Sequence, residues 1–268
     1  MKKYRLFIWV ILLLQLSSCD DVFEYSPYVI NFDEHESNLT QKNINRLLSN
    51  DVSDTINIAL AGDSHRFYDE SGKLVSTINQ HYNIDFFIHT GDIADYGIPR
   101  QYQWGNDIFS KLNAPYFVVV GNHDLVSNGN DSYREMFGDY NFSFVYGRYK
   151  FVFMNTNSRE YAFNGEVPDI GWFENEISPS EDFEKAVVVF HTPPFDNDFD
   201  SELEEPFVDV LTRFNNVLFV THGHLHGFNF SYPYVDEIPF VNTPSPEKKQ
   251  FVIIKIFNHE FTVDPIGF

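Results

Sequence analysis

The chain has 268 residues, of which 39 are Asp or Glu and 18 are Lys or Arg, so its net charge at pH 7 is −21. A field of that sign disfavours long nucleic acids and electrostatic adhesion to anionic lipid. The single cysteine, Cys19, excludes a disulfide within the chain, and the 29 Phe and 15 Tyr residues favour a thick, strand-rich core.

The first predicted element is a secretory signal. Residues 2–5 carry three basic side chains and precede the apolar run 6–16, which is too short to cross a bilayer comfortably. The sequence Leu-Ser-Ser-Cys at residues 16–19 resembles the lipobox of bacterial lipoproteins, in which cleavage precedes a cysteine that receives lipid. An ordinary signal peptide with an incidental cysteine is the alternative. We expect residues 1–18 to be removed, which would leave a net charge of −24, because they hold three basic and no acidic residues.

The next segment, residues 19–54, is interpreted as a lipidated tether and lead-in, with weak helical periodicity at 43–48. The protein is expected to be an exported bacterial lipoprotein, held by lipid on Cys19 at the periplasmic or cell-surface side of a membrane. Residues 55–268 are long enough for one large domain.

Within that domain the pattern of the first half alternates. Three short apolar runs are predicted strands: 56–60, 84–88 and 116–120. The stretches 72–82 and 99–112 between them have helical spacing. Strands that alternate with crossover helices favour an α/β fold with parallel neighbours.

The second half is predicted to contain hairpins as well. Strands 141–146 and 149–155 flank Gly147-Arg148, a two-residue hairpin signal, and strands 251–257 and 260–263 flank Asn258-His259. Two further predicted strands, 186–190 and 217–220, each run into a histidine. A helix is predicted at 172–177 and an acidic surface loop at 196–205.

Each predicted core strand ends in Gly or an apolar residue followed by Asp, Asn or His. Because ligands in α/β sheets gather outside the carboxyl ends of strands, these side chains should converge on one crevice. Asp63 and His65, two apart in a segment expected to be extended, can then bind one metal ion. Mixed nitrogen and oxygen ligation without thiolate suits Mn, Fe or Zn. Two such ions, roughly 3.5–4 Å apart, would polarise a phosphoryl oxygen and activate a water molecule.

Five motifs in this order resemble the signature of the calcineurin-like metallophosphoesterase superfamily. They are Asp63-Ser64-His65, Gly91-Asp92, Gly121-Asn122-His123-Asp124, His191 and Gly223-His224-Leu225-His226. The resemblance spans residues 62–226 and implies a two-sheet α/β/β/α sandwich with a dinuclear metal site at the strand carboxyl ends. Purple acid phosphatases, a related branch, have a tyrosine at the position of Asp95 and a non-histidine at that of His65. The tyrosinate-to-iron charge transfer of that branch is therefore not expected.

The same resemblance implies a role for each motif residue. One metal ion would be held by Asp63, His65, Asp92 and His226, and the other by Asp92, Asn122, His191 and His224. A hydroxide that bridges the two ions would attack the phosphorus of a phosphomonoester or phosphodiester of small size. His123 would contact the phosphate and protonate the leaving oxygen, and Asp95 would orient His123.

Two other functions are weighed against hydrolysis of a small phosphate ester. A non-catalytic metal- or phosphate-binding surface lipoprotein on the same scaffold would be marked by missing ligands, and none of the seven is missing. Nuclease activity also occurs in the resembled family, but the acidic charge and the lack of a basic stripe disfavour long nucleic acids. His222, Arg66 and Asn155 lie near the motifs and could face the substrate or serve the structure alone.

Overall fold

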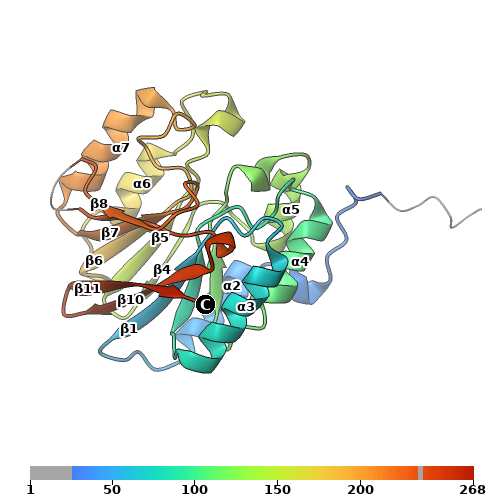
Figure 1. The fold of residues 1–268 in the computed structure, drawn as a ribbon. Coiled ribbons are helices and arrows are strands. Elements are labelled where there is room, and N and C mark those ends of the chain that lie inside the picture. The colour runs from blue at the N-terminus through green and yellow to red at the C-terminus, as the bar shows by residue number, and fades with distance from the viewer. Residues whose placement is uncertain (1–25, 235–237) are drawn as a thin grey trace, which may run out of the picture.

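The computed structural model describes residues 26–234 and 238–268, so the predicted signal peptide and Cys19 lie outside the described residues. Two β-sheets pack against each other, and helices cover the outer face of each sheet (Figure 1). Three apolar cores separate these four layers. The predicted α/β/β/α sandwich is therefore confirmed.

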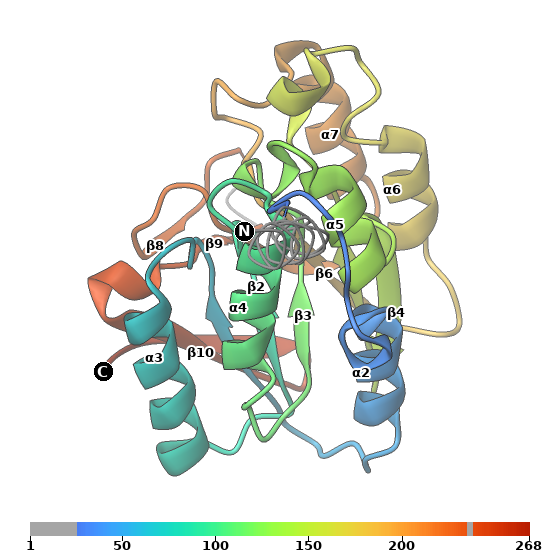
Figure 2. The ribbon, with the colours of Figure 1, turned by 90° about the vertical axis from the view of Figure 1, so that its right-hand side faces the viewer.

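The first sheet has five strands, in the spatial order β11, β10, β1, β2 and β3. These strands are Glu260–Gly267, Gln250–Phe257, Ile56–Ala61, Phe86–His89 and Tyr116–Val118. β1, β2 and β3 run parallel to one another, whereas β10 is antiparallel to β1. Three helices cover the outer face: α3 (Tyr68–His81), α4 (Pro99–Phe109) and α5 (Gly129–Met136). Figure 2 shows α3 and α4 side by side. The strands and helices predicted here are confirmed with shifted ends, while α5 was not predicted.

The second sheet has six strands, in the order β4, β5, β6, β7, β9 and β8. These strands are Phe142–Tyr146, Tyr149–Phe153, Lys185–Val189, Val217–His222, Phe240–Asn242 and Asn229–Ser231. β5, β6, β7 and β9 are parallel neighbours, and β4 and β8 are the antiparallel edges. Helices α6 (Ile170–Ile177) and α7 (Ser201–Arg213) cover its outer face (Figure 1). β8 and β9, of three residues each, were not predicted.

The predicted acidic surface loop at 196–205 is wrong in its second half, since α7 begins at Ser201. The Asp200 carboxylate accepts a hydrogen bond from the backbone N–H of Glu202 and so caps the helix. Glu202 and Glu204 lie in the first turn, where negative charge interacts favourably with the helix dipole. The acidic run is therefore a helix start.

The segment before the first strand also packs on the domain. Helix α2 (Leu39–Leu48) lies against β3, and Leu47 is fully buried in the core between the two sheets. Across the part of the chain that the structure describes, no helix combines the length and apolar character that crossing a bilayer requires.

Candidate metal centre

Five loops that follow parallel strands meet at one edge of the sandwich and carry the motif residues. The loops after β1, β2 and β3 come from the first sheet, and those after β6 and β7 come from the second. The backbone N–H of His224 donates to the Asp63 carboxylate, although 161 positions separate the two residues. The structure brings together all seven predicted ligands: Asp63, His65, Asp92, Asn122, His191, His224 and His226.

The seven side chains form two adjoining groups around Asp92. In the first group, His65 Nε2 lies 3.5 Å from Asp92 Oδ2, and His226 Nε2 lies 3.4 Å from Asp63 Oδ1. In the second group, His191 Nε2 lies 3.2 Å from the same Asp92 Oδ2 atom. One carboxylate oxygen therefore faces both groups.

The side-chain oxygen of Asn122 completes the second group. It lies 3.0 Å from His191 Nε2 and 3.2 Å from His224 Nδ1. His191 Nδ1 lies 2.7 Å from the backbone carbonyl of Thr90 and donates its proton to it. In a neutral His191, Nε2 then carries only a lone pair, which faces the oxygens of Asn122 and Asp92. Electron-pair donors that face one another at these distances fit around a cation.

The burial of the two central carboxylates points the same way. Asp63 is 0% exposed and Asp92 is 1% exposed. Burial raises the pKa of Asp63 to about 8. Burial lowers the pKa of His191, but the Asp92 and Asp63 carboxylates outweigh burial and raise it to about 10. Without a metal ion the site therefore retains protons, whose positive charge a bound cation would replace.

The donor set also fits metal ions by composition. Within the described residues, three groups of motif side chains each present three ligand atoms within 4.8 Å of one another. They are Asp63-His65-His226, Asp63-Asp92-His191 and His65-Asp92-His123. Imidazole nitrogens and carboxylate oxygens suit Mn, Fe or Zn, so the residues present fit the predicted metal ions.

The motif glycines are needed for this close approach. A Cβ atom on Gly121 would lie 2.2 Å from Asp92 Oδ1, and one on Gly91 would lie 2.5 Å from His191 Nδ1. Gly91 also has a φ of +96°, which side chains rarely adopt. The glycines before Asp92 and Asn122 therefore let two loops touch.

The expected extended segment at Asp63 and His65 is wrong. Their φ angles are +51° and +37°, in the left-handed region. Asp92, His224 and His226 also have positive φ angles, of 60°, 72° and 57°. Five of the seven predicted ligands therefore lie in a backbone conformation that non-glycine residues adopt at a cost.

Asp124 holds two motif loops together, a role that the sequence did not reveal. Its buried carboxylate accepts hydrogen bonds from the backbone N–H groups of Asp92, Ala94 and Gly121, at 2.8–2.9 Å. The Tyr102 hydroxyl donates to its backbone carbonyl. The place of Asp124 in the Gly-Asn-His-Asp motif was the only sign of this role in the sequence. Which backbone N–H groups donate to its carboxylate depends on the fold.

His123 and Asp95 lie beside the first group. His123 Nδ1 is 2.9 Å from the backbone carbonyl of Asp95 and 3.7 Å from its carboxylate, so the close contact is to the main chain. The Asp95 carboxylate also lies 3.6 Å from His65 Nδ1, a buried nitrogen without a hydrogen bond, and 3.5 Å from the Arg66 guanidinium. The His123 side chain is 43% exposed, which leaves it accessible to a substrate.

The structure also places His222, Asn155 and Arg66, whose roles the sequence left open. His222 is buried against Phe190, and burial lowers its pKa to about 3, so it is a neutral core residue. Asn155 is buried, and its side-chain oxygen accepts hydrogen bonds from Asn157. Arg66 is largely exposed beside Asp95.

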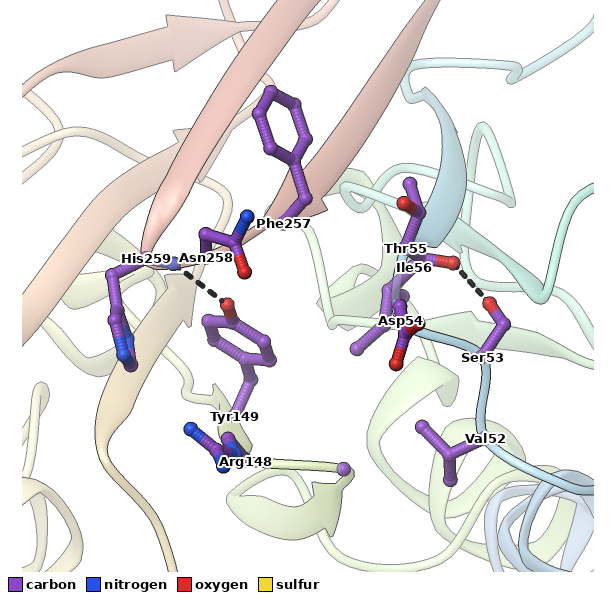
Figure 3. Close-up of a pocket in the computed structure, with 11 residues that line it drawn as sticks. Val52, Ser53, Asp54, Thr55, Ile56, Arg148, Tyr149, Phe257, Asn258 and His259 are labelled. Atoms are coloured by element: carbon purple, nitrogen blue, oxygen red, sulfur yellow. Dashed lines mark hydrogen bonds between the residues drawn. The ribbon is translucent and has the colours of Figure 1, made fainter.

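A cavity of about 730 Å³ lies away from the metal centre, at the opposite ends of the strands. It is lined by the segment that leads into β1 and by the β4–β5 and β10–β11 turns (Figure 3). Tyr149 and His259 are joined there by a hydrogen bond from the His259 backbone N–H to the Tyr149 hydroxyl. None of the seven predicted ligands lines this cavity.

Comparisons with known proteins match this arrangement. The model of the calcineurin-like phosphoesterase family matches residues 56–228. A probable cyclic nucleotide phosphodiesterase of Coxiella burnetii is 28% identical over 174 residues, which cover 59% of this chain and 66% of the relative. A probable glycerophosphodiester phosphodiesterase of Arcobacter nitrofigilis is 25% identical over 155 residues, which cover 53% and 56%. The chain thus spans less than two thirds of the length of these curated relatives.

Solved structures share the fold at low sequence identity. A dimetal phosphatase from Danio rerio superposes with a TM-score of 0.63 at 13% identity, over 79% of this chain and 96% of that one. A purple acid phosphatase from yellow lupin seeds gives a TM-score of 0.60 at 12% identity, over 81% and 52%. At these identities the likeness concerns the fold alone.

Proposed function

Because the chain belongs to the calcineurin-like phosphoesterase family, we propose that it is a metal-dependent hydrolase of small phosphate esters. The observation that carries this proposal is the convergence of seven Asp, Asn and His side chains on one edge, with His123 exposed beside them. No described residue of the predicted ligand set points elsewhere, which disfavours a scaffold that binds without catalysis.

The proposed ligands form two sets that share Asp92. Asp63, His65, Asp92 and His226 would hold one ion, and Asp92, Asn122, His191 and His224 would hold the other. Two ions bound there would polarise a phosphoryl oxygen and lower the pKa of the attacking water. Asp92 is suited to the shared position because its Oδ2 atom lies within 3.5 Å of a histidine from each set.

His123 is proposed to protonate the leaving oxygen. Its Nδ1 proton is held by the backbone carbonyl of Asp95, so Nε2 is the ring nitrogen left to face the substrate. The Asp95 carboxylate lies 3.7 Å from His123 Nδ1 and 3.6 Å from His65 Nδ1. Asp95 therefore acts as a positioning residue for both rings.

A phosphodiester of a small organic molecule is the proposed substrate class. The relatives from Coxiella burnetii and Arcobacter nitrofigilis bear names of phosphodiesterases, one for cyclic nucleotides and one for glycerophosphodiesters. The acidic chain is unsuited to long polyanions.

We expect the metal-loaded protein to hydrolyse an aryl phosphodiester faster than an aryl phosphomonoester. A panel with both aryl esters, a cyclic nucleotide, a glycerophosphodiester and a sugar-nucleotide pyrophosphate would rank the substrates by kcat/KM. Faster monoester hydrolysis would contradict the assignment to diesters. Absence of turnover on the entire panel by a fully metal-loaded protein would favour the binding function.

Binding of Mn²⁺ should stabilise the fold. At a free concentration about 100 times the Kd, one ion adds about 2.7 kcal/mol, which corresponds to about 5–10 °C in Tm for a domain of this size. Because Mn²⁺ displaces protons from the site, the gain should grow as the pH rises towards the pKa of about 8 of Asp63. Differential scanning fluorimetry with Mn²⁺ and then EDTA measures this effect. An equal Tm with and without Mn²⁺ would contradict the proposed centre.

Attachment to a membrane by lipid on Cys19 is part of the proposal. Its support is the apolar run 6–16 and the lipobox-like residues 16–19. In a bacterial host, labelled palmitate should be incorporated into the full chain and not into the Cys19→Ala variant. Equal labelling of the two chains, or none in the natural one, would show that Cys19 is not the lipid site.

A further inference from the structure

The loop between β6 and α7 reaches the metal centre, although no motif lies in it. Asp196 Oδ1 lies 3.4 Å from His224 Nε2, and Asp198 Oδ2 lies 3.8 Å from the same atom. All three side chains are only slightly exposed, at 16–23%. Two carboxylates therefore face the imidazole nitrogen that points away from Asn122.

The two carboxylates constrain the protonation of His224. An ionised carboxylate only accepts hydrogen bonds, so the proton of a neutral imidazole is favoured on Nε2. Nδ1 then carries the lone pair, and Nδ1 is the atom that lies 3.2 Å from the Asn122 oxygen. The acids thus select the tautomer that a metal ligand needs.

The loop is itself held in place on both sides. Asp196 Oδ1 accepts the backbone N–H of Asp198 at 2.9 Å. The Arg159 guanidinium donates to Asp198 Oδ1 at 2.8 Å, and the Arg159 backbone N–H donates to the Asp198 carbonyl at 3.1 Å. The charge-assisted bond to Arg159 leaves Oδ2 as the Asp198 oxygen nearer to His224.

The group Asp196-Asp198-His224 also has the spacing of a cation site, since its ligand atoms lie within 4.8 Å of one another. Two observations favour a role in positioning His224 over a cation site. Arg159 already supplies a positive charge to Asp198. A neutral imidazole has one lone pair, and a cation at Nε2 would compete with the one proposed at Nδ1.

We propose that Asp196 and Asp198 are positioning residues of the metal centre, whose negative charge beside Nε2 of His224 favours the proton there and thereby leaves Nδ1 to face the second metal ion. The inference rests on the proposed function for the identity of the second ligand set. It adds the β6–α7 loop to the residues that determine metal affinity. Interactions of this kind typically change metal affinity by about 10–100-fold.

The test compares an Asp196→Ala/Asp198→Ala double variant with the full natural chain. Titration calorimetry with Mn²⁺ should show one equivalent bound about 10–100-fold more weakly and the other unchanged. The Asp196→Asn/Asp198→Asn variant keeps the side-chain shape but removes the negative charge at each position and should lose a similar share of this affinity. A Glu202→Ala/Glu205→Ala variant removes two negative charges from exposed positions on α7 and should bind both ions normally.

A second readout does not depend on metal or activity. Long-range ¹H–¹⁵N spectra of the metal-free protein report which nitrogen of His224 is protonated, and the alanine variant should lose the Nε2-H form. If the protein binds no Mn²⁺ but the alanine variant loses the Nε2-H form, the proposed function is contradicted, whereas the effect of Asp196 and Asp198 on His224 stands. If a folded alanine variant keeps both the tautomer of His224 and the Mn²⁺ affinity, Asp196 and Asp198 are not positioning residues. A third Mn²⁺ equivalent that disappears with Asp196 and Asp198 would identify a cation site instead.

Discussion

Replacement of Asp92 by Asn should prevent normal binding of both metal ions and lower turnover of an aryl phosphodiester by at least about 10³-fold. The reason is the position of one atom. Asp92 Oδ2 lies 3.5 Å from His65 Nε2 and 3.2 Å from His191 Nε2, so it is the shared oxygen of both ligand sets. An amide has the same shape but no net charge, and when its oxygen accepts the His123 backbone N–H, its NH2 group takes the Oδ2 position, where it cannot bind a metal ion.

The fold should tolerate this change. Asp92 has a φ of +60°, and Asn is among the residues that accept this conformation. Its backbone N–H still donates to Asp124, and an amide oxygen can still accept the His123 backbone N–H that now meets Oδ1. The expected defect therefore lies in metal binding and not in folding.

Metal content by atomic emission, calorimetry with Mn²⁺ and kcat/KM together measure the effect. Asp85→Asn is the matched control, because Asp85 precedes β2 at its other end and bonds to the Asn57 backbone N–H. That variant should keep both ions. Two equivalents bound to Asp92→Asn with natural affinity would show that Asp92 does not bridge.

Replacement of His123 by Ala should leave metal binding intact and reduce turnover by about 10²–10⁴-fold, the usual contribution of a general acid. The imidazole is half-exposed beside the metal centre, and none of the seven predicted ligands depends on its ring for a hydrogen bond. The loss should be greatest for leaving groups of high pKa, which need a proton to depart, and small for nitrophenolate.

A series of diesters with leaving groups of graded pKa provides the measurement, with calorimetry to show that both ions are bound. His35→Ala is a suitable control, because His35 is exposed on a short helix far along the chain from every motif. If the dependence of rate on leaving-group pKa is the same in His123→Ala and the natural protein, His123 is not the proton donor.

The α/β class and the convergence of the motif residues could be predicted from local patterns in the sequence, whereas the two-sheet sandwich and the ligand set were implied by the family resemblance. Apolar runs that end in Gly-Asp, Gly-Asn or a histidine mark the carboxyl ends of buried strands, and such ends meet at one edge of a sheet. In the structure, Asp63, Asp92 and His191 lie together at such an edge. The family match over residues 56–228 confirms the resemblance that the motifs carry.

The partners of these residues could not be read in the same way. Which acid meets His224 depends on how the β6–α7 loop folds back, and Asp196 and Asp198 look like ordinary surface charges in the sequence. Asp95 was expected to orient His123, but the sequence could not show that its backbone carbonyl makes a closer contact with the ring than its carboxylate does. α7 was not predicted, because the acidic residues of its first turn resemble a surface loop, although acids are favoured there.

The left-handed backbone at five of the seven ligands bears on how this protein evolves. Each such residue costs about 1–2 kcal/mol relative to an ordinary conformation, and glycine would remove that cost. Mutation of a ligand to glycine would relieve this backbone cost while it destroyed the centre. The backbone conformation alone gives no reason to keep side chains at these positions, so a chain that retains Asp63, His65, Asp92, His224 and His226 together bears the mark of selection for its chemistry.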